Sequence, residues 1–399
     1  MPEKLAHVCP RFKEIHGGGE PVLLNLFHHL SNLGYENTVY TYNFPDGLRN
    51  QMDSRVILKQ LPALFNRQFK NVLLAGFYDL FCTAFFAPRI HSRADVVCFY
   101  SENVVPGLFF YRLFNHNKKS LYFCFQPPRF AYDTAKETAR AGGALGWLLP
   151  TFKTLYRPFD RMAVRQAQRV ATFSNGYKRW IENIYGIRDV KVIPPGVELL
   201  AKVSPIPDNI REKIFGPYVK TLICVGKLVT WKNVDRLISI TARVKETFAN
   251  VRLLVVGDGP CMSTLKEQTA RMGMQEHVVF CGYVASEDVF GYLQAADLLV
   301  LLEKNASFGL ALIEANSTGL PVMALEGGGP SDIVCHGKNG FLLSVDISDQ
   351  EVADRICRFF KDEARIKTMR AHAADVARQY TWRRFARIFS DVIIDLHGR

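Results

Sequence analysis

The sequence lacks several patterns that would place it in common protein classes. Its 399 residues contain nine cysteines but no C-x-x-C pair, and they contain no Asp-x-Asp pair and no G-x-G-x-x-G fingerprint. Scattered cysteines without metal-ligand spacing indicate reduced core residues of a cytosolic protein and not a disulfide framework. The missing glycine fingerprint argues against a dinucleotide-dependent dehydrogenase.

Long apolar runs are also missing. The most apolar stretch, 72–88, is interrupted by Asp79 and is too short to cross a bilayer. Because the sequence runs from Met1 directly into a short strand, we expect no signal peptide. These patterns predict a cytoplasmic location, and they leave open a position at the inner face of the cytoplasmic membrane.

The charge balance is strongly positive, with a formal net charge of +12. Such an excess suits nucleic acid, an anionic membrane surface or phosphorylated substrates. No nucleic-acid-binding module accompanies it, so we expect no nucleic-acid partner and favour the other two. A hydrophobic fraction of 48% over 399 residues predicts a folded chain with two domains.

Short apolar strands alternate with helical segments through both halves of the sequence. This alternation predicts an α/β protein with parallel sheets and right-handed crossovers. The segment 194–196, Pro-Pro-Gly, combines rigid prolines with a permissive glycine and is typical of an interdomain hinge. We therefore expect two doubly wound domains with a cleft between them, followed by a C-terminal helix that is apolar on one side only.

Glycine-rich and basic loops lie where predicted strands lead into helices. Three glycines at 17–19 follow the first strand, and glycine lets a backbone approach a ligand closely. Lys227 and Lys232 share a similar loop, and the sequence Gly-Asp-Gly-Pro at 257–260 ends another strand. Each loop is a candidate ligand site, and a glycine turn without a ligand is the alternative.

The stretch 301–319 leaves a buried strand, forms a polar loop and enters a predicted helix near Phe308 that ends at Gly319. Free N–H groups at that helix N-terminus, together with the helix dipole, favour a phosphate. Glu314 lies inside the helix, where its carboxylate could accept a hydrogen bond from a ligand hydroxyl. An ordinary surface helix is the alternative.

Residues 60–125 are unusually aromatic, and basic residues are interleaved with the rings. This combination suits a membrane interface, so we expect a peripheral contact with anionic membrane, although most of the rings are expected in the core. Four arginines spaced by four residues are expected on one helix, facing lipid phosphate or water: Arg157, Arg161, Arg165 and Arg169.

In this order and spacing, the motifs resemble those of the retaining GT-B glycosyltransferases of the large mannosyltransferase-like family. The likeness spans almost the full length, and its signature E-x-F-G-L-x-x-x-E aligns with 306–314. It implies a GT-B architecture of two Rossmann-like domains facing across a cleft. The implied parts are an acceptor-binding domain at 1–192, a donor-binding domain at 193–376 and a helix at 377–399 that crosses back to the first domain.

The resemblance implies a nucleoside-diphosphate sugar as donor, with GDP-mannose the first choice and a UDP-sugar the second, and neither metal nor cofactor. Lys227 and Lys232 would hold the diphosphate, and Glu314 would accept from the ribose hydroxyls. Two cations and a helix N-terminus can offset a pyrophosphate without a metal. The other implied donor-binding residues are Gly18, Gly19, Gly257, Phe308, Gly309 and Leu310.

The implied reaction is transfer of a hexose, with retention of configuration, to a glycan or lipid-linked acceptor in polysaccharide or O-antigen-like synthesis. A strand at 121–125 is followed by polar residues, and such residues past a strand end lie where ligands bind. The element 123–133 resembles the Y-C-H-x-P-x-R element of transferases that act on lipid-linked glycans. The implied acceptor-binding residues are Gly17, Gln126, Arg129 and Asp133.

Two residues depart from the family pattern. Phe125 stands where many relatives have histidine, and Ala306 stands where the signature has its first glutamate. Since alanine cannot hydrogen-bond a donor sugar, we expect inactivation or attenuation. Three accounts explain Ala306. The one we favour is an inactivating change made to trap a substrate complex. The others are a natural variant in which Glu303 or Asn305 replaces the carboxylate, and a protein that binds the donor without turnover.

Two other functions remain open at this stage. Ala306 and Phe125 suit a non-catalytic protein that binds a nucleotide sugar. A GT-B-like nucleotide-sugar epimerase would share the donor site but would convert its donor without an acceptor.

Overall fold

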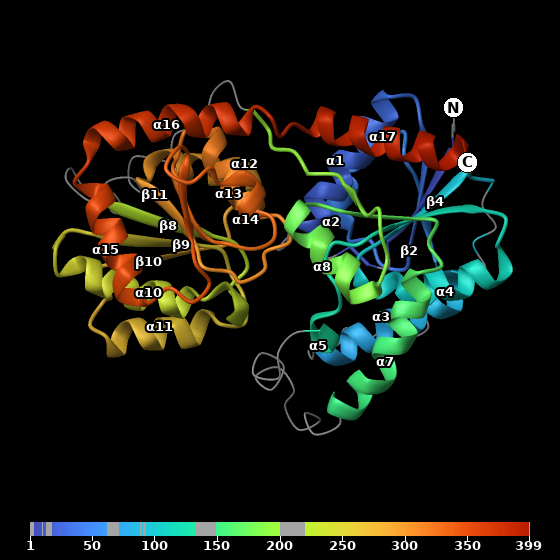
Figure 1. Ribbon diagram of the computed structural model, residues 1–399, viewed down its shortest axis with the longest axis horizontal. Helices are drawn as coiled ribbons and strands as arrows, with labels where there is room; N and C mark the ends of the chain where they lie inside the picture. The colour runs from blue at the N-terminus through green and yellow to red at the C-terminus, as the bar shows by residue number, and fades with distance from the viewer. Residues whose placement is uncertain are drawn as a thin grey trace. The chain divides into compact units, whose positions relative to one another are not determined.

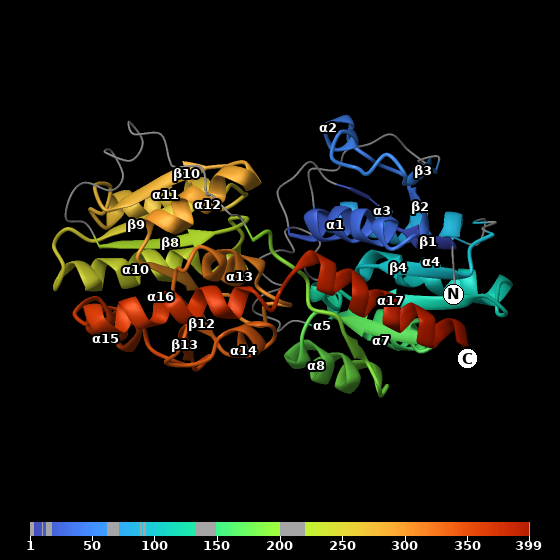
Figure 2. The same cartoon turned by 90° about the horizontal axis from the view of Figure 1, so that it is seen from above.

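The computed structural model describes residues 4–9, 11–12, 18–61, 72–87, 90, 93–132, 149–199 and 220–398. The chain divides into two compact units, each built on a sheet covered by helices (Figures 1 and 2). The first unit comprises Met1–Pro194 together with Trp382–Arg399, and the second comprises Pro195–Thr381. The C-terminal helix therefore belongs with the N-terminal half of the chain.

The first unit contains a seven-stranded parallel sheet in the order β3-β2-β1-β4-β5-β6-β7. Because helices cover both faces, its central strands are continuous apolar runs, and all five residues of β4 are buried. The strand order reverses at β1, which pairs with β2 on one side and β4 on the other. The strands are β1 (Lys4–Val8), β2 (Glu36–Thr41), β3 (Ile57–Gln60), β4 (Val96–Tyr100), β5 (Lys119–Phe123), β6 (Arg169–Thr172) and β7 (Lys191–Val192).

Two layers of helices enclose this sheet. Neighbouring residues of β5 point to opposite faces: Tyr122 lies in the core beneath α4, and the ring of Phe123 lies 6.2 Å from that of Phe389 in α17. The helices are α1 (Gly19–Asn32), α2 (Asp46–Arg49), α3 (Val72–Phe86), η2 (Glu102–Val104), α4 (Val105–Phe114), α5 (Arg129–Tyr132), α7 (Leu149–Val164), α8 (Asn175–Tyr185) and α17 (Trp382–Gly398).

Helix α17 is held to the first unit by apolar and polar contacts. Phe385 and Phe389 are 1% and 0% exposed, as the one-sided apolar pattern of this helix predicts. The hydroxyls of Tyr35 and Ser390 lie 2.6 Å apart, and Asp395 accepts a hydrogen bond from Arg169 at 3.1 Å. The helix therefore completes one face of the first sheet.

The second unit contains a six-stranded parallel sheet in the order β10-β9-β8-β11-β12-β13. Strand β8 pairs with β9 on one side and with β11 on the other, so the order reverses between β8 and β11. Ligands of open α/β sheets bind beyond the carboxyl ends of the strands at such a point. The strands are β8 (Thr221–Val225), β9 (Arg252–Val256), β10 (Val278–Gly282), β11 (Leu298–Leu301), β12 (Val322–Leu325) and β13 (Gly340–Leu343).

Helices of the second unit pack on both faces of its sheet (Figure 1). Helix α15 begins with a capping box, in which Ser348 and Glu351 each bond the other's backbone N–H. The helices are η4 (Thr230–Lys232), α10 (Val234–Lys245), α11 (Met262–Arg271), α12 (Ser286–Ala295), α13 (Leu310–Ser317), α14 (Pro330–Ile333), α15 (Asp349–Phe360) and α16 (Glu363–Ala377).

The predicted α/β class with two doubly wound parallel sheets is confirmed. The prediction that four arginines share one helix is wrong, because α7 ends at Val164 and Arg169 already belongs to β6. The chain turns at 165–168 to bring β6 alongside β5, and Arg165 donates to the carbonyl of Tyr185 at 2.6 Å. Within the described residues, no helix is long and apolar enough to span a membrane.

Candidate functional site

A partly buried ion pair lies at the point where the strand order of the second sheet reverses. Lys232, in the loop after β8, places its Nζ 2.5 Å from Oε2 of Glu303, which follows β11. The Glu303 side chain is only 8% exposed. Asn233 donates its side-chain amide to the carbonyl of Leu302 at 2.7 Å, which fixes the same loop to the end of β11. The two loops thus form one unit around a charged pair.

Lys227 lies in the same loop but is exposed. A small pocket in the second unit is lined by Lys227, Lys232, Gly226 and apolar residues of β8, α10 and β11. Both lysines that the sequence assigns to a diphosphate therefore contribute to one pocket. Their positive charge lies beyond the carboxyl ends of the strands, where such sheets bind ligands.

The glycine turn after β9 packs directly against the loop that contains Lys227 and Lys232. Gly257 has a φ of +136°, and a Cβ atom built on it would lie 2.0 Å from the carbonyl oxygen of Gly226. Leu228 donates its N–H to the carbonyl of Asp258 at 2.9 Å. Close backbone packing therefore explains the glycine at 257 without a ligand contact.

The loop that carries the family signature is packed against a second glycine run. Ala306 and Phe308 are 1% and 2% exposed, and Ala306 accepts a hydrogen bond from the N–H of Gly329 at 2.9 Å. A Cβ on Gly329 would lie 2.2 Å from the Cα of Phe308. The ring of Phe308 also contacts that of Tyr380 edge-on, with centroids 5.6 Å apart. The loop is thereby held rigidly before α13.

Helix α13 starts at Leu310, two residues later than predicted, and Gly309 precedes it with a φ of +94°. No side chain caps its N-terminus among the described residues. The N–H of Leu312 donates to the carbonyl of Gly309 at 2.8 Å, so a ligand would meet the N–H groups of the two preceding residues. Burial raises the pKa of Glu314, in the middle of this helix, to about 7. A carboxyl group with that pKa changes charge near neutral pH.

In the first unit, polar side chains meet at the carboxyl ends of β4 and β5. Gln126 donates to a carboxylate oxygen of Glu102 at 3.4 Å, and Arg129 donates to the amide oxygen of Gln126 at 3.3 Å. Ser101, between β4 and Glu102, has a φ of +72°, a strained value for a residue with a side chain. The structure thus brings two predicted acceptor-binding residues together with Glu102.

The start of α1 lies beside Phe125. A Cβ on Gly19 would lie 3.5 Å from the Phe125 ring, and that ring packs on Phe173 with centroids 4.7 Å apart. Gly18 is the N-cap residue of α1 and is exposed. An aromatic cluster thus occupies the place where the resemblance expects histidine.

The predicted site residues are distributed over both units. Gly18, Gly19, Gln126 and Arg129 lie in the first, while Gly17 and Asp133 lie outside the described residues. The predicted residues of the second unit are Lys227, Lys232, Gly257, Ala306, Phe308, Gly309, Leu310 and Glu314.

Sequence reasoning missed Glu102 and Asn233, and it treated Glu303 only as a stand-in for the missing glutamate. Glu102 and Glu303 each follow the carboxyl end of a central strand, the same signal that indicated Gln126 and Arg129. Asn233 has a φ of +52°, a conformation that asparagine tolerates better than most residues. The strand ends therefore contained enough information to find the two carboxylates.

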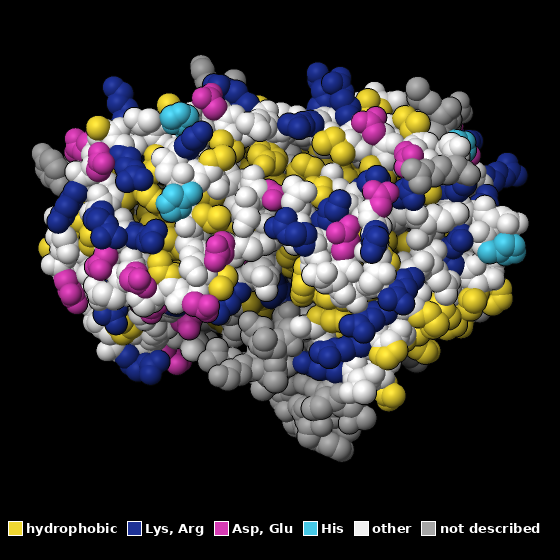
Figure 3. Space-filling view, in the orientation of Figure 1, with side chains coloured by type: hydrophobic (Ala, Val, Ile, Leu, Met, Phe, Trp, Pro, Cys, Tyr) yellow, Lys and Arg dark blue, Asp and Glu magenta, His cyan; other side chains and the backbone are white. Residues whose placement is uncertain are grey.

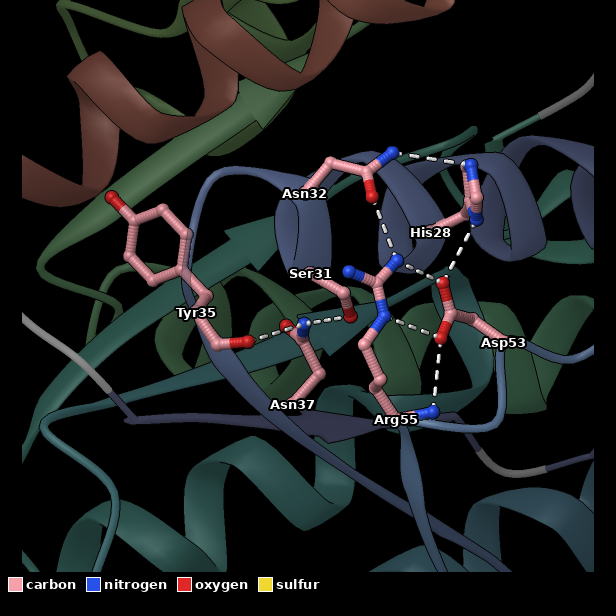
Figure 4. Close-up of polar contacts among 7 residues, drawn as sticks. All are labelled: His28, Ser31, Asn32, Tyr35, Asn37, Asp53 and Arg55. Carbon is pink, nitrogen blue, oxygen red and sulfur yellow. Dashed lines mark hydrogen bonds and ion pairs between the residues drawn. The ribbon is translucent and has the colours of Figure 1, made fainter.

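A second polar cluster in the first unit is structural (Figure 4). Asp53 accepts hydrogen bonds from Arg55 at 2.6 Å and from His28 at 2.8 Å, and Arg55 also donates to Asn32. The hydrogen bonds from Arg55 hold the pKa of Asp53 well below its usual range. Because these groups bind one another, the cluster fastens the loop after α2 to α1.

Solved structures define the fold class. Over 99% of each chain, the protein superposes on the sucrose-phosphate synthase of Thermosynechococcus elongatus with a TM-score of 0.83 and 17% identity. Alr3699/HepE of Anabaena, in complex with UDP-glucose, gives a TM-score of 0.72 at 18% identity, over 98% of this chain and 99% of the other. The two parallel sheets are therefore those of a GT-B fold.

Sequence comparison gives the family. Residues 16–199 match the model "Glycosyltransferase Family 4", and residues 207–379 match "Glycosyl transferases group 1". The GDP-mannose-dependent alpha-(1-6)-phosphatidylinositol monomannoside mannosyltransferase of Mycobacterium tuberculosis is 26% identical over 266 residues, 63% of this chain and 67% of that protein. The chain belongs to the mannosyltransferase-like GT-B glycosyltransferases.

Proposed function

We propose that this glycosyltransferase moves a hexose from a nucleoside-diphosphate sugar to a glycan or lipid-linked acceptor, with retention of configuration and without a metal or other cofactor. The observation that carries this proposal is the Lys227–Lys232 loop, fixed through Glu303 at the strand-order reversal of the second sheet. Two cations at that place suit a pyrophosphate better than any neutral ligand.

In the proposed donor complex, Lys227 and Lys232 bind the diphosphate, and the backbone at 308–310 donates to it from the start of α13. Glu314 accepts from the ribose hydroxyls. Lys232 already has Glu303 as its counter-ion, so it is positioned before the donor arrives. Preorganised charges of this kind stabilise a leaving group without further rearrangement.

The proposed chemistry is attack from the face that the leaving group departs from. The acceptor oxygen bonds the anomeric carbon as the bond from that carbon to the diphosphate oxygen breaks, and the departing diphosphate takes the acceptor proton. The protein then contributes positioning and stabilisation of the growing negative charge. In the first unit, Gln126 and Arg129 are the described residues that we assign to the acceptor.

GDP-mannose is the proposed donor, and a UDP-sugar is the second choice. The mycobacterial relative is named for GDP-mannose, and the Anabaena structure holds UDP-glucose. The lipid in the name of this mycobacterial enzyme supports a lipid-linked acceptor and a role in polysaccharide or glycolipid synthesis. We further propose that Ala306 lowers turnover, because its methyl group offers no hydrogen bond to the donor sugar.

The test is donor binding by thermal shift, followed by calorimetry, with GDP-mannose, UDP-glucose and their nucleotides. A ligand that binds only the folded protein raises its melting temperature. We expect Lys227→Ala to weaken binding about tenfold, since it removes one charged contact. Lys361→Ala, another exposed lysine of the second unit, should leave binding unchanged. Equal affinities of the two variants would contradict the proposed diphosphate site.

A non-catalytic protein that binds a nucleotide sugar is the second candidate, and the buried methyl group of Ala306 and the ring of Phe125 favour it. Donor binding without any transfer, even after a glutamate is restored at 306, would support it. An epimerase would convert the donor in the absence of acceptor. Product analysis with donor alone therefore distinguishes an epimerase from a glycosyltransferase.

A further inference from the structure

Three adjacent helices of the first unit expose large apolar side chains to solvent. Helices α3, α4 and α7 pack side by side, with the rings of Phe109 and Phe159 5.3 Å apart and Gly107 closely packed on the α3 backbone. We define the apolar face by Phe81 and Phe85 of α3, Phe110, Leu113 and Phe114 of α4, and Leu155 of α7.

Three side chains of this face are mostly exposed. Phe81, Phe114 and Leu155 are 62%, 71% and 72% exposed. Phe81 and Phe85 on α3, and Phe110 and Phe114 on α4, are four residues apart, so each pair lies on one side of its helix. Leu155 is the member of the face on α7. In the part of α3 whose side chains the structure describes, Asp79 and Thr83 are buried, and the exposed side chains Phe81 and Phe85 are apolar. Exposed patches of this kind mark interaction surfaces.

The exposed charges on these three helices have a single sign. In the described helices α3, α4 and α7, the only carboxylates are Asp79 and Asp160, which are 3% and 0% exposed. Asp79 is bound by Arg11 at 2.8 Å, and Asp160 accepts from Tyr132 at 2.8 Å. Arg161 of α7 is exposed, and Lys153 and Arg157 are half-buried. Figure 3 shows Lys and Arg side chains gathered along α7 beside the hydrophobic ones over α4. Arg112 of α4 is engaged within the protein, because it donates to the carbonyl of Lys118 at 2.5 Å.

The apolar face and the basic residues beside it favour one kind of partner. A second copy of the chain would bring the same basic side chains together, and like charges repel. An anionic bilayer offers phosphates to the arginines and an interfacial region in which aromatic rings are stable. We propose that the apolar face, with Arg161 and its basic neighbours on α7, docks the protein on an anionic lipid bilayer.

The same helix that meets the lipid also fixes the acceptor side of the first unit. Arg157 donates to the carbonyl of Ala131 at 2.7 Å, and its guanidinium lies 5.7 Å from the centre of the Tyr132 ring. Tyr132 in turn binds Asp160 of α7. Helix α7 therefore anchors α5, which begins with Arg129. We expect docking through α7 to bring the Gln126–Arg129 pair close to acceptors carried in the bilayer. The assignment of this pair to the acceptor rests on the proposed function.

The test is flotation of the full-length protein with vesicles, in the absence of donor and acceptor. One vesicle is pure phosphatidylcholine, and the other contains about 30% phosphatidylglycerol. We expect binding to the anionic vesicle, weakened by high salt, and little binding to the neutral one. Because no sugar transfer is measured, failure of the proposed reaction and failure of docking are seen separately.

Variants locate the surface. Phe114→Ser combined with Leu155→Ser should weaken vesicle binding about tenfold or more, and Arg161→Ala about fivefold. Met272→Ser replaces an exposed apolar residue of the second unit and should have no effect. Each variant is checked by its melting temperature, which should be unchanged because the replaced side chains are exposed.

Three outcomes would overturn the proposal. The first is absence of binding to the anionic vesicle, which would leave the face to a protein partner. The second is equal binding by the Phe114–Leu155 variant and the Met272 variant. The third is a solution dimer that becomes monomeric when Phe114 and Leu155 are replaced, which light scattering would reveal and which would assign the face to a second copy.

Discussion

Ala306 occupies the position of the first signature glutamate, and its side chain is almost fully buried. We predict that Ala306→Glu raises the rate of sugar transfer about ten- to a hundredfold or more, because one restored charged hydrogen bond is worth roughly 1.5–3 kcal/mol. Initial rates with a matched acceptor measure the effect. Ala306→Gln is the uncharged control, and unchanged melting temperatures exclude a folding effect. Equal rates for the parent protein, Ala306→Glu and Ala306→Gln would contradict this prediction.

Glu314 leads to a prediction about pH. Burial raises the pKa of this carboxyl to about 7, so in the free protein it is neutral below that pH and ionised above it. If the ionised form accepts from the ribose, donor affinity should fall about tenfold between about pH 8 and about pH 6. Calorimetry at several pH values measures the affinity.

Two controls isolate the carboxylate. Glu314→Gln cannot titrate, so its donor affinity should be flat over that range once titration of the nucleotide itself is subtracted. A deoxyribose nucleotide should likewise lose the dependence on pH. The assignment to Glu314 fails if the glutamine variant keeps the slope of the parent protein.

At the scale of elements, the loop before α13 depends on the loop after β12. A Cβ on Gly329 would lie 2.0 Å from the carbonyl oxygen of Phe308, so Gly329→Ala must displace one of the two loops. We predict that donor affinity falls about tenfold and that the second unit loses roughly 1–3 kcal/mol of stability. Gly47→Ala, at a site with open space, is the control and should change neither quantity. Calorimetry and denaturant unfolding measure the two effects.

The sequence allowed the elements to be predicted where their signals are local. Apolar runs such as 121–125 and 251–256 indicated buried strands, and the one-sided apolar pattern near the C-terminus indicated a packed helix. The arginine spacing misled because a repeat of four residues says nothing about where a helix ends. Val164 ends α7, and only the pairing of β6 with β5 explains why.

Contacts between distant segments could not be predicted in the same way. Glu303 pairs with Lys232 across 71 positions of sequence, and Arg169 pairs with Asp395 across 226. Periodicity gives the face of each element, but the choice of partner depends on strand order and packing. The lysine loop and the glutamate could each be recognised in the sequence. Their ion pair could not be predicted, because it depends on how the two loops are brought together by the fold.

At the scale of the whole molecule, α17 links the end of the described chain to its beginning. We predict that Phe389→Asp, which buries a charge at a fully enclosed position, strongly destabilises the first unit and leaves the second folded. Ile394→Asp, on the same helix but 37% exposed, is the matched control. Hydrogen exchange measured for both units should show loss of protection in the first unit of the Phe389 variant alone. Equal loss in both units would mean that they fold as one.

The return of α17 to the first unit also orders events during synthesis. Residues 195–381 lie between the first unit and its final helix, so the ribosome must make the entire second unit before α17 exists. Until then the α1 side of the first sheet, including Phe123, has no cover from Phe385 and Phe389. The domain that leaves the ribosome first is therefore completed last, and the side of its sheet around Phe123 is exposed to aggregation during that interval.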